Sequence, residues 1–335
     1  MTIAVVPRRR VYVIAEAGVN HNGSLEMATE LVRAAQSAGA DAVKFQAFRA
    51  EALASPRARK AEYQACGTGG DQSQLDMLRT LEFGEDEHRA MLAVGREVGI
   101  AVLSSAFDLE SLAMLLRLGI TTLPYLRAVA SAARDRAGRV ILSTGMADLS
   151  EVGAALEVLD SGGVAGDDIA LLQCTTEYPA PPAGVNLLAM VAMRKAFGVA
   201  VGYSDHTQGI AISTAAVALG ASIIEKHLTL DRALSGPDHR ASLEPDEFGR
   251  MVEAIREVEV ALGDGVKQPT AAEMANREIV RKSIVAGRPI AACERFSDDN
   301  LTARRPGTGM SPMRWDDVVG ATAPRDFAAD EEVEL

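Results

Sequence analysis

Short apolar runs of strand length recur along most of the chain, and longer segments with a helical apolar period separate them. One such segment places Met27, Leu31 and Ala35 on one helix face. Strands that alternate with helices in this way indicate βαβ units and a parallel sheet. We therefore predict an α/β fold whose strands include the runs at 11–15, 42–45, 101–103, 140–142, 169–173, 199–202 and 222–224.

The predicted strands are one fewer than the eight of a closed (β/α)8 TIM barrel. At 335 residues the chain is long enough for such a barrel, which takes about 250 residues, and for one small extra module. The gap lies between the runs at 101–103 and 140–142, where the only β-capable residues are 120–123, just before Pro124. We predict a TIM barrel in which residues 120–123 form the short fourth strand.

The character of the sequence changes after Leu262, where glycines and a proline are typical of a linker, and an amphipathic stretch follows at 271–280. Beyond it, short apolar runs punctuated by Gly and Pro predict a small β-rich module with a limited core of its own, which packs against a barrel. These runs lie at 283–286, 290–292 and 301–303. We expect a barrel domain over 1–265, a linker over 266–282 and a β-rich domain over 283–335.

The composition excludes several classes of partner. The formal net charge is -12 and the pI about 5.0, so the protein repels polyanions and we expect no nucleic acid partner. The longest apolar stretch, 209–224, is too short and too polar to span a bilayer, so we expect no membrane partner. Arg8, Arg9 and Arg10 have no apolar h-region beside them, so we expect no secretory signal there, and Cys66, Cys174 and Cys293 have no C-x-x-C spacing. We expect a cytoplasmic protein without structural disulfides, in which Cys174 is simply buried.

Two histidines stand just past predicted strands. His206 lies in Gly-Tyr-Ser-Asp-His-Thr and His227 in Ile-Glu-Lys-His-Leu-Thr. If these strands are neighbours in a parallel barrel, both imidazoles lie on one rim, and imidazole is the commonest protein metal ligand. A single histidine is more often structural, but this pair favours a metal site.

A lysine and several hydroxyl groups occupy similar positions. Lys44 and Gln46 alternate with Phe45, so they share the face that points into the barrel or to its rim. A lysine there is costly to bury unless it meets an anion. Four hydroxyl residues at other strand ends are candidates to donate to that anion, although the capping of a following helix explains any one of them equally well: Ser105, Ser143, Thr176 and Ser204.

Ten short motifs follow one another along nearly the whole chain. They are 14–23 (IAEAGVNHNG), 44–46 (KFQ), 61–63 (AEY), 73–75 (SQL), 141–146 (ILSTGM), 174–179 (CTTEYP), 202–207 (GYSDHT), 225–227 (EKH), 236–239 (GPDH) and 305–309 (RPGTG). Together they resemble the sialic acid synthase family. The resemblance implies a TIM barrel followed by a small antifreeze-like (SAF) domain, in a homodimer with swapped C-terminal domains. It also implies condensation of phosphoenolpyruvate with an N-acylated hexosamine, which gives a nine-carbon, sialic-acid-type 2-keto-3-deoxy acid and phosphate.

The resemblance assigns roles to several of these residues. It implies that His206 and His227 are catalytic through a divalent ion, Mn²⁺ or Mg²⁺, which polarises the sugar aldehyde. It implies that Lys44 contacts phosphoenolpyruvate. Glu16 and Asp238 are then catalytic as well, either as bases or by orienting groups around the substrates.

Three further residues are expected to bind substrate. Phe107 and Tyr178 shape the sugar pocket by resemblance. Arg305 belongs to the C-terminal module, and the swapped dimer implies that it reaches the active site of the partner subunit. The planar fork of arginine suits an N-acyl oxygen or a carboxylate.

The chain departs from the family at one place. The family carries Lys-Ile-x-Ser-Gly-Glu on its fourth strand, and this chain lacks that stretch between Gly119 and Thr121. Because each hydrogen bond to a charged group is worth about 1.5 to 3 kcal/mol, one alternative is a weak or inactive homologue that binds sugar or pairs with an intact subunit. A second alternative is a Schiff-base aldolase with Lys44 or Lys226 as nucleophile. The sugar remains open between N-acetylmannosamine and a 2,4-diacetamido relative that leads to legionaminic acid.

Overall fold

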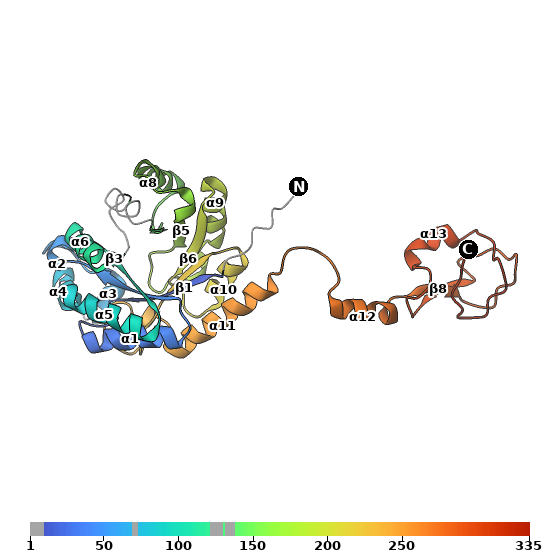
Figure 1. Cartoon of the computed structure of the whole chain (residues 1–335), viewed down its shortest axis with the longest axis horizontal. Coiled ribbons are helices and arrows are strands. Elements are labelled where there is room, and N and C mark those ends of the chain that lie inside the picture. The colour runs from blue at the N-terminus through green and yellow to red at the C-terminus, as the bar shows by residue number, and fades with distance from the viewer. Residues whose placement is uncertain (1–9, 69–72, 121–129, 131–137) are drawn as a thin grey trace. The chain divides into compact units, whose positions relative to one another are not determined.

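The structure is a computed structural model that describes residues 10–68, 73–120, 130 and 138–335 (Figure 1). The chain divides into two compact units, Met1–Asp264 and Gly265–Leu335. The first unit is built on a curled sheet of seven parallel strands in the order β3-β2-β1-β7-β6-β5-β4. The strands are β1 (Tyr12–Gly18), β2 (Ala42–Ala47), β3 (Ala101–Ala106), β4 (Val140–Ser143), β5 (Ile169–Cys174), β6 (Ala200–Asp205) and β7 (Ile223–His227). Each of the seven predicted runs corresponds to one of these strands, so that prediction is confirmed.

Helices cover the outer face of the sheet and follow one another around it in the order α10, α11, α1, α5, α6 (Figure 1). The helices of this unit are α1 (Leu25–Ser37), α2 (Ala50–Leu53), α3 (Glu62–Thr68), α4 (Gln74–Leu81), α5 (Glu85–Val98), α6 (Leu109–Leu118), α8 (Leu149–Ser161), α9 (Leu187–Phe197), α10 (Ala211–Ala218) and α11 (Pro245–Ala261), with short 3-10 turns at Gly166–Asp168, Pro182–Gly184 and His239–Ala241. Ser24, Asp108 and Asp148 begin α1, α6 and α8 by accepting backbone N–H groups. None of the described helices combines the length and the apolar character needed to cross a membrane.

Between β3 and β4 the sheet has no further strand among the described residues. The predicted fourth strand at 120–123 falls largely here, and residues 121–123 lie outside the described part of the chain. Ile120, which follows the C-cap of α6, is buried against Ala106 and Leu112. The architecture is that of a TIM-type barrel, and the identity of its fourth strand stays a prediction.

The second unit contains the predicted amphipathic helix and a small β structure. Its elements are α12 (Ala271–Val280), β8 (Ser283–Ala286), β9 (Leu301–Arg304), a 3-10 turn at Pro312–Arg314 and α13 (Trp315–Val318). Strands β8 and β9 pair antiparallel, and Phe296 and Phe327 lie in the core of the unit. Helix α12 has no buried residue, and its apolar Met274 and Ile279 side chains are 49% and 67% exposed. This helix therefore carries apolar surface that nothing in its own unit covers.

Two buried histidines make the stability of the first unit sensitive to acid. His21 is stacked on Phe83 with ring centroids 3.8 Å apart, and its Nδ1 accepts the Gly23 N–H at 3.1 Å. His239 is also buried, and its Nδ1 lies 2.7 Å from the Thr229 hydroxyl. Burial lowers the pKa of His21 to about 3 and that of His239 to about 4. Both rings are therefore neutral in the folded protein, whereas an unfolded histidine titrates near pH 6.5.

We expect the free energy of unfolding to fall as the pH drops from 6.5 towards 4, because only the unfolded chain takes up these protons in that range. At pH 5 the contribution of His21 alone is about 2 kcal/mol, and His239 acts in the same direction. Urea denaturation at pH 7.5 and pH 5.0 measures the loss. In His21→Gln the loss between the two pH values should be smaller by about 2 kcal/mol, and an unchanged loss would contradict the assignment.

Candidate active site

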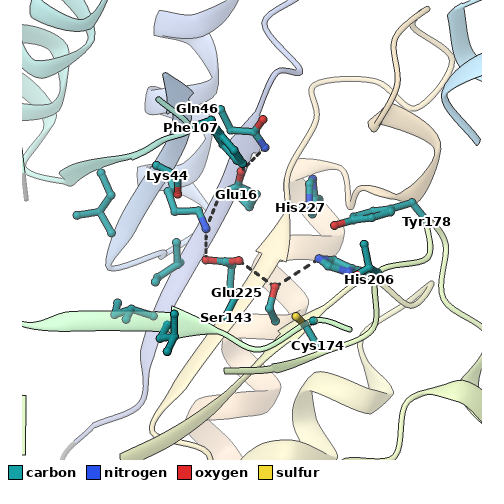
Figure 2. Close-up of a pocket in the computed structure, with 18 of the residues that line it drawn as sticks. Glu16, Lys44, Gln46, Phe107, Ser143, Cys174, Tyr178, His206, Glu225 and His227 are labelled. Carbon is teal, nitrogen blue, oxygen red and sulfur yellow. Dashed lines mark hydrogen bonds and ion pairs between the residues drawn. The ribbon is translucent and has the colours of Figure 1, made fainter. Parts of the chain in front are cut away.

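A cavity of about 530 Å³ opens at the carboxyl ends of the barrel strands (Figure 2). Parallel strands bring side chains from distant parts of the sequence to this one edge. Eleven of the thirteen residues singled out in the sequence line the cavity: Glu16, Lys44, Gln46, Ser105, Phe107, Ser143, Thr176, Tyr178, Ser204, His206 and His227. The strand pattern was therefore a reliable guide to which side chains meet.

A lysine between two carboxylates forms the charged centre of the cavity. The Lys44 Nζ lies 3.2 Å from Glu16 Oε2 and forms a second ion pair with Glu225 Oε2. Gln46 Nε2 donates to Glu16 Oε1 at 3.3 Å, and Ser204 Oγ donates to Glu225 Oε1 at 2.8 Å. Figure 2 shows the Lys44 amine pointing at both carboxyl groups. The buried lysine thus has two carboxyl groups as partners within the protein itself.

Burial and ion pairing together set the protonation of this trio. Burial raises the pKa of Glu16 to about 8, although Lys44 opposes the rise. Burial also acts against the Glu225 carboxylate, but Lys44 and Ser204 outweigh it and hold the pKa of Glu225 below its usual range. Burial also acts against the Lys44 ammonium group, but Glu16 and Glu225 outweigh it and raise the pKa of Lys44. At neutral pH the trio therefore holds one ammonium, one carboxylate and one protonated acid, Glu16, with no net charge.

Neither lysine of the aldolase alternative is placed for Schiff-base chemistry. Lys226 is fully buried, forms an ion pair with Asp205 and is not among the residues that line the cavity. Lys44 does line the cavity, but its ammonium form is stabilised, whereas a Schiff base requires a neutral amine. The geometry does not support an aldolase.

Two cavity residues with titratable side chains, Glu225 and Cys174, were not assigned a role from the sequence. Glu225 lies in the Glu-Lys-His motif, and alternation along β7 places it on the same face as His227. The spacing of two residues between Glu225 and His227 was the sequence signal that could have identified Glu225. Cys174 was expected to be simply buried, which is wrong, because it is only partly buried at the end of β5 and lines the cavity. Burial raises the pKa of the Cys174 thiol to about 11, so it is not a thiolate nucleophile at neutral pH.

The two histidines predicted as metal ligands lie side by side, with ring centroids 5.4 Å apart. The His206 Nδ1 lies 2.6 Å from the Thr175 carbonyl oxygen and must donate to it, so the lone pair of the neutral ring is on Nε2, 3.4 Å from the Ser204 hydroxyl. The His227 Nδ1 is buried without a hydrogen-bond partner. Burial lowers the pKa of both rings, so both are neutral, as metal binding requires. The donor set therefore fits a divalent cation.

The protein supplies few other ligands for such an ion. Among the described residues, no group of three or more His, Cys, Asp or Glu side chains is arranged to hold a metal. A cation between His206 and His227 would then take its remaining ligands from water or substrate. That is the open type of site found in catalytic rather than structural metal centres.

An aromatic stack forms one wall of the cavity. The Tyr178 ring lies 4.1 Å from the His206 ring and 5.6 Å from the His227 ring, measured between centroids. Tyr63 of α3 also contacts Tyr178, with ring centroids 5.0 Å apart. Figure 2 shows Tyr178 beside both imidazoles. This wall gives the cavity an apolar face next to its polar floor.

Two of the predicted site residues do not line the cavity. The Asp238 Oδ2 lies 4.0 Å from His227 Nδ1, and burial raises the pKa of Asp238 to about 6. It is therefore a close neighbour of the cavity wall. Arg305 belongs to the second unit, where it is exposed and its Nε donates to the Val280 carbonyl oxygen at 2.9 Å.

A curled parallel sheet with this polar cavity at the carboxyl ends of its strands defines an enzyme of the TIM-barrel class. The model of the NeuB family matches residues 31–267, and the model of the SAF domain matches residues 281–333. The chain therefore belongs to the NeuB family and carries a SAF domain. The family resemblance and the fold predicted from the sequence are both confirmed.

The relatives of the chain include named synthases. It is 47% identical over 333 residues to the N,N'-diacetyllegionaminic acid synthase of Campylobacter jejuni subsp. jejuni serotype O:2, which covers 96% of this chain and 98% of that protein. It is 42% identical over 330 residues to the synthase of the same name from Legionella pneumophila, with 95% and 92% covered. Among solved structures, N-acetylneuraminic acid synthetase from Leptospira borgpetersenii serovar Hardjo-bovis superimposes with a TM-score of 0.68 at 31% identity, covering 82% of this chain and 94% of that one.

Proposed function

We propose that this protein condenses phosphoenolpyruvate with an N-acylated hexosamine to give a nine-carbon 2-keto-3-deoxy acid and phosphate. The observation that carries the proposal is the charge-balanced trio of Glu16, Lys44 and Glu225 at the floor of the cavity. Lys44 is the only lysine or arginine among the described residues that line the cavity. It is the group to which the anion of phosphoenolpyruvate binds. The two relatives named as N,N'-diacetyllegionaminic acid synthases support the same reaction.

In this reaction C3 of phosphoenolpyruvate forms a bond to the aldehyde carbon of the sugar. The aldehyde oxygen gains a proton, and the water oxygen adds to C2 and becomes the keto oxygen by losing both of its protons. Phosphate leaves with its bridging oxygen and one of these protons, and the other replaces the proton given to the aldehyde oxygen. Glu16 has a pKa of about 8 and is protonated at neutral pH, so it can supply that proton. Ser105, Ser143 and Thr176 line the same cavity, and we assign to their hydroxyl groups the role of donors to the anion. The protonated Glu16 also lowers the repulsion that the incoming anion meets.

The sugar we propose is a 2,4-diacetamido hexosamine. The relative at 47% identity is named for an acid with two acetyl groups, which favours this sugar over N-acetylmannosamine. Phe107 and the stacked Tyr178 offer aromatic faces against which acyl methyl groups can pack. Competition between the two sugars in one reaction mixture distinguishes them directly.

His206 and His227 are the residues that would hold a divalent cation, Mn²⁺ or Mg²⁺. When bound, such an ion acts as a Lewis acid that polarises a carbonyl oxygen. The protein's own part is to keep both imidazoles neutral and oriented, through burial and through the Thr175 carbonyl group.

Phosphate release should require phosphoenolpyruvate, a 2,4-diacetamido hexosamine and a divalent cation together. We expect chelation to lower the rate at least tenfold, and added Mn²⁺ or Mg²⁺ to restore it, because the two imidazoles alone polarise an aldehyde poorly. A colorimetric phosphate assay with each component omitted in turn measures this. Release of phosphate without any sugar would point to a phosphatase and contradict the synthase.

We further propose a homodimer in which the C-terminal domains are swapped, so that Arg305 completes the active site of the partner subunit. The exposed apolar side chains of α12 support an association that covers them. The exposed Arg305 guanidinium, held only by the Val280 carbonyl group among described contacts, is available for a substrate carboxylate or N-acyl oxygen.

Mixing an Arg305→Ala chain with a His206→Ala chain should restore part of the activity that each lacks alone, since a mixed dimer contains one intact site. The assay is phosphate release by purified mixed dimers carrying two different affinity tags. No recovery in verified mixed dimers would refute the shared site, and activity of Arg305→Ala alone at the unaltered rate would remove Arg305 from it.

A second candidate, a homologue that binds ligands with weak or no turnover, is favoured by one observation. The described cavity offers a single ammonium group, and two carboxyl groups already bind it. Binding of sugar and phosphoenolpyruvate without phosphate release would support this candidate.

A further inference from the structure

A fully buried ion pair lies on the outer face of β6 and β7, next to helix α10. The Lys226 Nζ is 3.0 Å from Asp205 Oδ2, and both side chains are 0% exposed. Ser213 of α10 donates its hydroxyl to the same carboxylate oxygen at 2.6 Å. Thr207 donates its N–H and its hydroxyl to Asp205 Oδ1 at 2.8 and 2.7 Å, and its carbonyl group accepts from Lys226 Nζ. Both carboxylate oxygens and the ammonium group therefore have partners.

The register of the two strands links this pair to the cavity. Asp205 and Lys226 stand opposite each other in the parallel pairing of β6 and β7. Side chains alternate along a strand, so the residues on either side of each point the other way. The residues that follow them, His206 and His227, both line the cavity. Asp205 and Lys226 thus form an ion pair between the two strands, and each directly precedes one of the two histidines.

An ion pair is a costly way to fill the space between a sheet and a helix. Both ions lose their hydration, and replacement of a buried pair by apolar side chains of similar volume is often neutral or even stabilising. What such a pair can provide is a fixed geometry, because its charges and hydrogen bonds restrict the groups that it joins to few relative positions. Here the pair binds Thr207, the residue after His206, at three polar groups, and Lys226 directly precedes His227. Each imidazole is flanked by an anchored residue.

We propose that Asp205 and Lys226 are positioning residues that hold His206 and His227 at the spacing needed to share one divalent cation. The two residues touch neither substrate nor cation and act through the backbone of β6 and β7. This inference rests on the proposed metal site. Because partners behind metal ligands typically contribute 10- to 100-fold to metal affinity, the expected effect is within easy reach of measurement.

The test compares the double variant Asp205→Asn/Lys226→Met with Ser213→Ala in the full-length protein. The double variant removes both charges and keeps the volume. Ser213→Ala removes one hydrogen bond from the same carboxylate and leaves the ion pair in place. We expect electron paramagnetic resonance titration with Mn²⁺ to show at least tenfold weaker binding in the double variant and unaltered binding in Ser213→Ala. If the double variant does not fold, Lys226→Met alone replaces it, with the same expected loss, because Thr207 and Ser213 still donate to the Asp205 carboxylate.

Thermal denaturation separates positioning from general destabilisation. Mn²⁺ affinity within twofold of the unaltered protein in the double variant would overturn the proposal. The proposal would also be overturned if Ser213→Ala lost Mn²⁺ affinity in step with its loss of thermal stability, because general destabilisation would then explain the weaker binding. Either result would make the pair a structural element only.

A measurement without metal tests the positioning role of Asp205 and Lys226 separately from the proposed metal site. The His206 ring lies 4.1 Å from the Tyr178 ring, so the ring current of Tyr178 shifts the His206 Hε1 resonance in the NMR spectrum. We expect that resonance to move in the double variant and to stay in place in Ser213→Ala. If the unaltered protein binds no Mn²⁺, the proposed metal site fails, and the resonance alone decides whether the pair positions the imidazoles. An unmoved resonance would then refute the positioning role.

Discussion

Replacing Lys44 with methionine is expected to lower kcat/KM for phosphoenolpyruvate at least a thousandfold. The change removes the only lysine or arginine cation among the described residues that line the cavity and leaves Glu16 and Glu225 facing an anionic substrate. A lost hydrogen bond to a charged group costs about 1.5 to 3 kcal/mol, and an unpaired buried charge costs about 3 to 5 kcal/mol. At about 1.4 kcal/mol for each factor of ten, even the lower sum exceeds a thousandfold. Phosphate release and calorimetric binding of phosphoenolpyruvate measure the two parts of the effect.

Two control variants separate the ammonium contact from simple repulsion. Lys44→Met/Glu225→Gln restores the charge balance without an ammonium group, so we expect partial recovery of phosphoenolpyruvate binding and little recovery of kcat. Lys195→Met removes an exposed lysine of α9 and should leave both unaltered. Full recovery in the double variant would mean that Lys44 serves only to neutralise its neighbours, and the proposed anion contact would be wrong.

The strand pattern carried most of the prediction of the site. Parallel strands meet at one edge, so a polar residue that follows an apolar run, such as His227, or alternates with apolar residues within one, such as Lys44, is placed at the cavity without any knowledge of tertiary contacts. The same rule predicts that Glu225, two residues before His227, faces the cavity, although no role was assigned to it from the sequence. In each case the information lies in the alternation of a single strand, which is a local property.

What the sequence could not supply depends on contacts between distant strands. The partly buried position of Cys174 at the cavity cannot be inferred from the apolar run in which it lies. The buried pair of Asp205 and Lys226 depends on the register of β6 against β7, and a shift of one residue would separate them. The protonated state of Glu16 likewise arises from burial beside Lys44. These are tertiary effects with no signature in local periodicity.

The Lys-Ile-x-Ser-Gly-Glu motif is missing from this chain between Gly119 and Thr121. Inserting a Lys-Ile-x-Ser-Gly-Glu segment between Gly119 and Thr121 is expected to raise phosphate release at least a hundredfold. Ser105 of β3 and Ser143 of β4 both line the cavity, so a strand restored between them in the chain would present its side chains to the same space. Two or more new contacts to charged groups, at about 1.5 to 3 kcal/mol each, account for a factor of one hundred or more.

The charge of the cavity is the reason to expect so large an effect. Phosphoenolpyruvate brings an ionised carboxylate and an ionised phosphate, whereas the trio around Lys44 has no net charge at neutral pH. A second lysine would supply the missing positive charge. The matched control is the same insertion with methionine in place of its lysine, which rebuilds the strand without the charge and should recover only a small part of the rate. If the chain without the insertion releases phosphate as fast as the chain with it, Lys44 and the hydroxyl groups of the cavity suffice for turnover, and the second candidate function falls with the prediction.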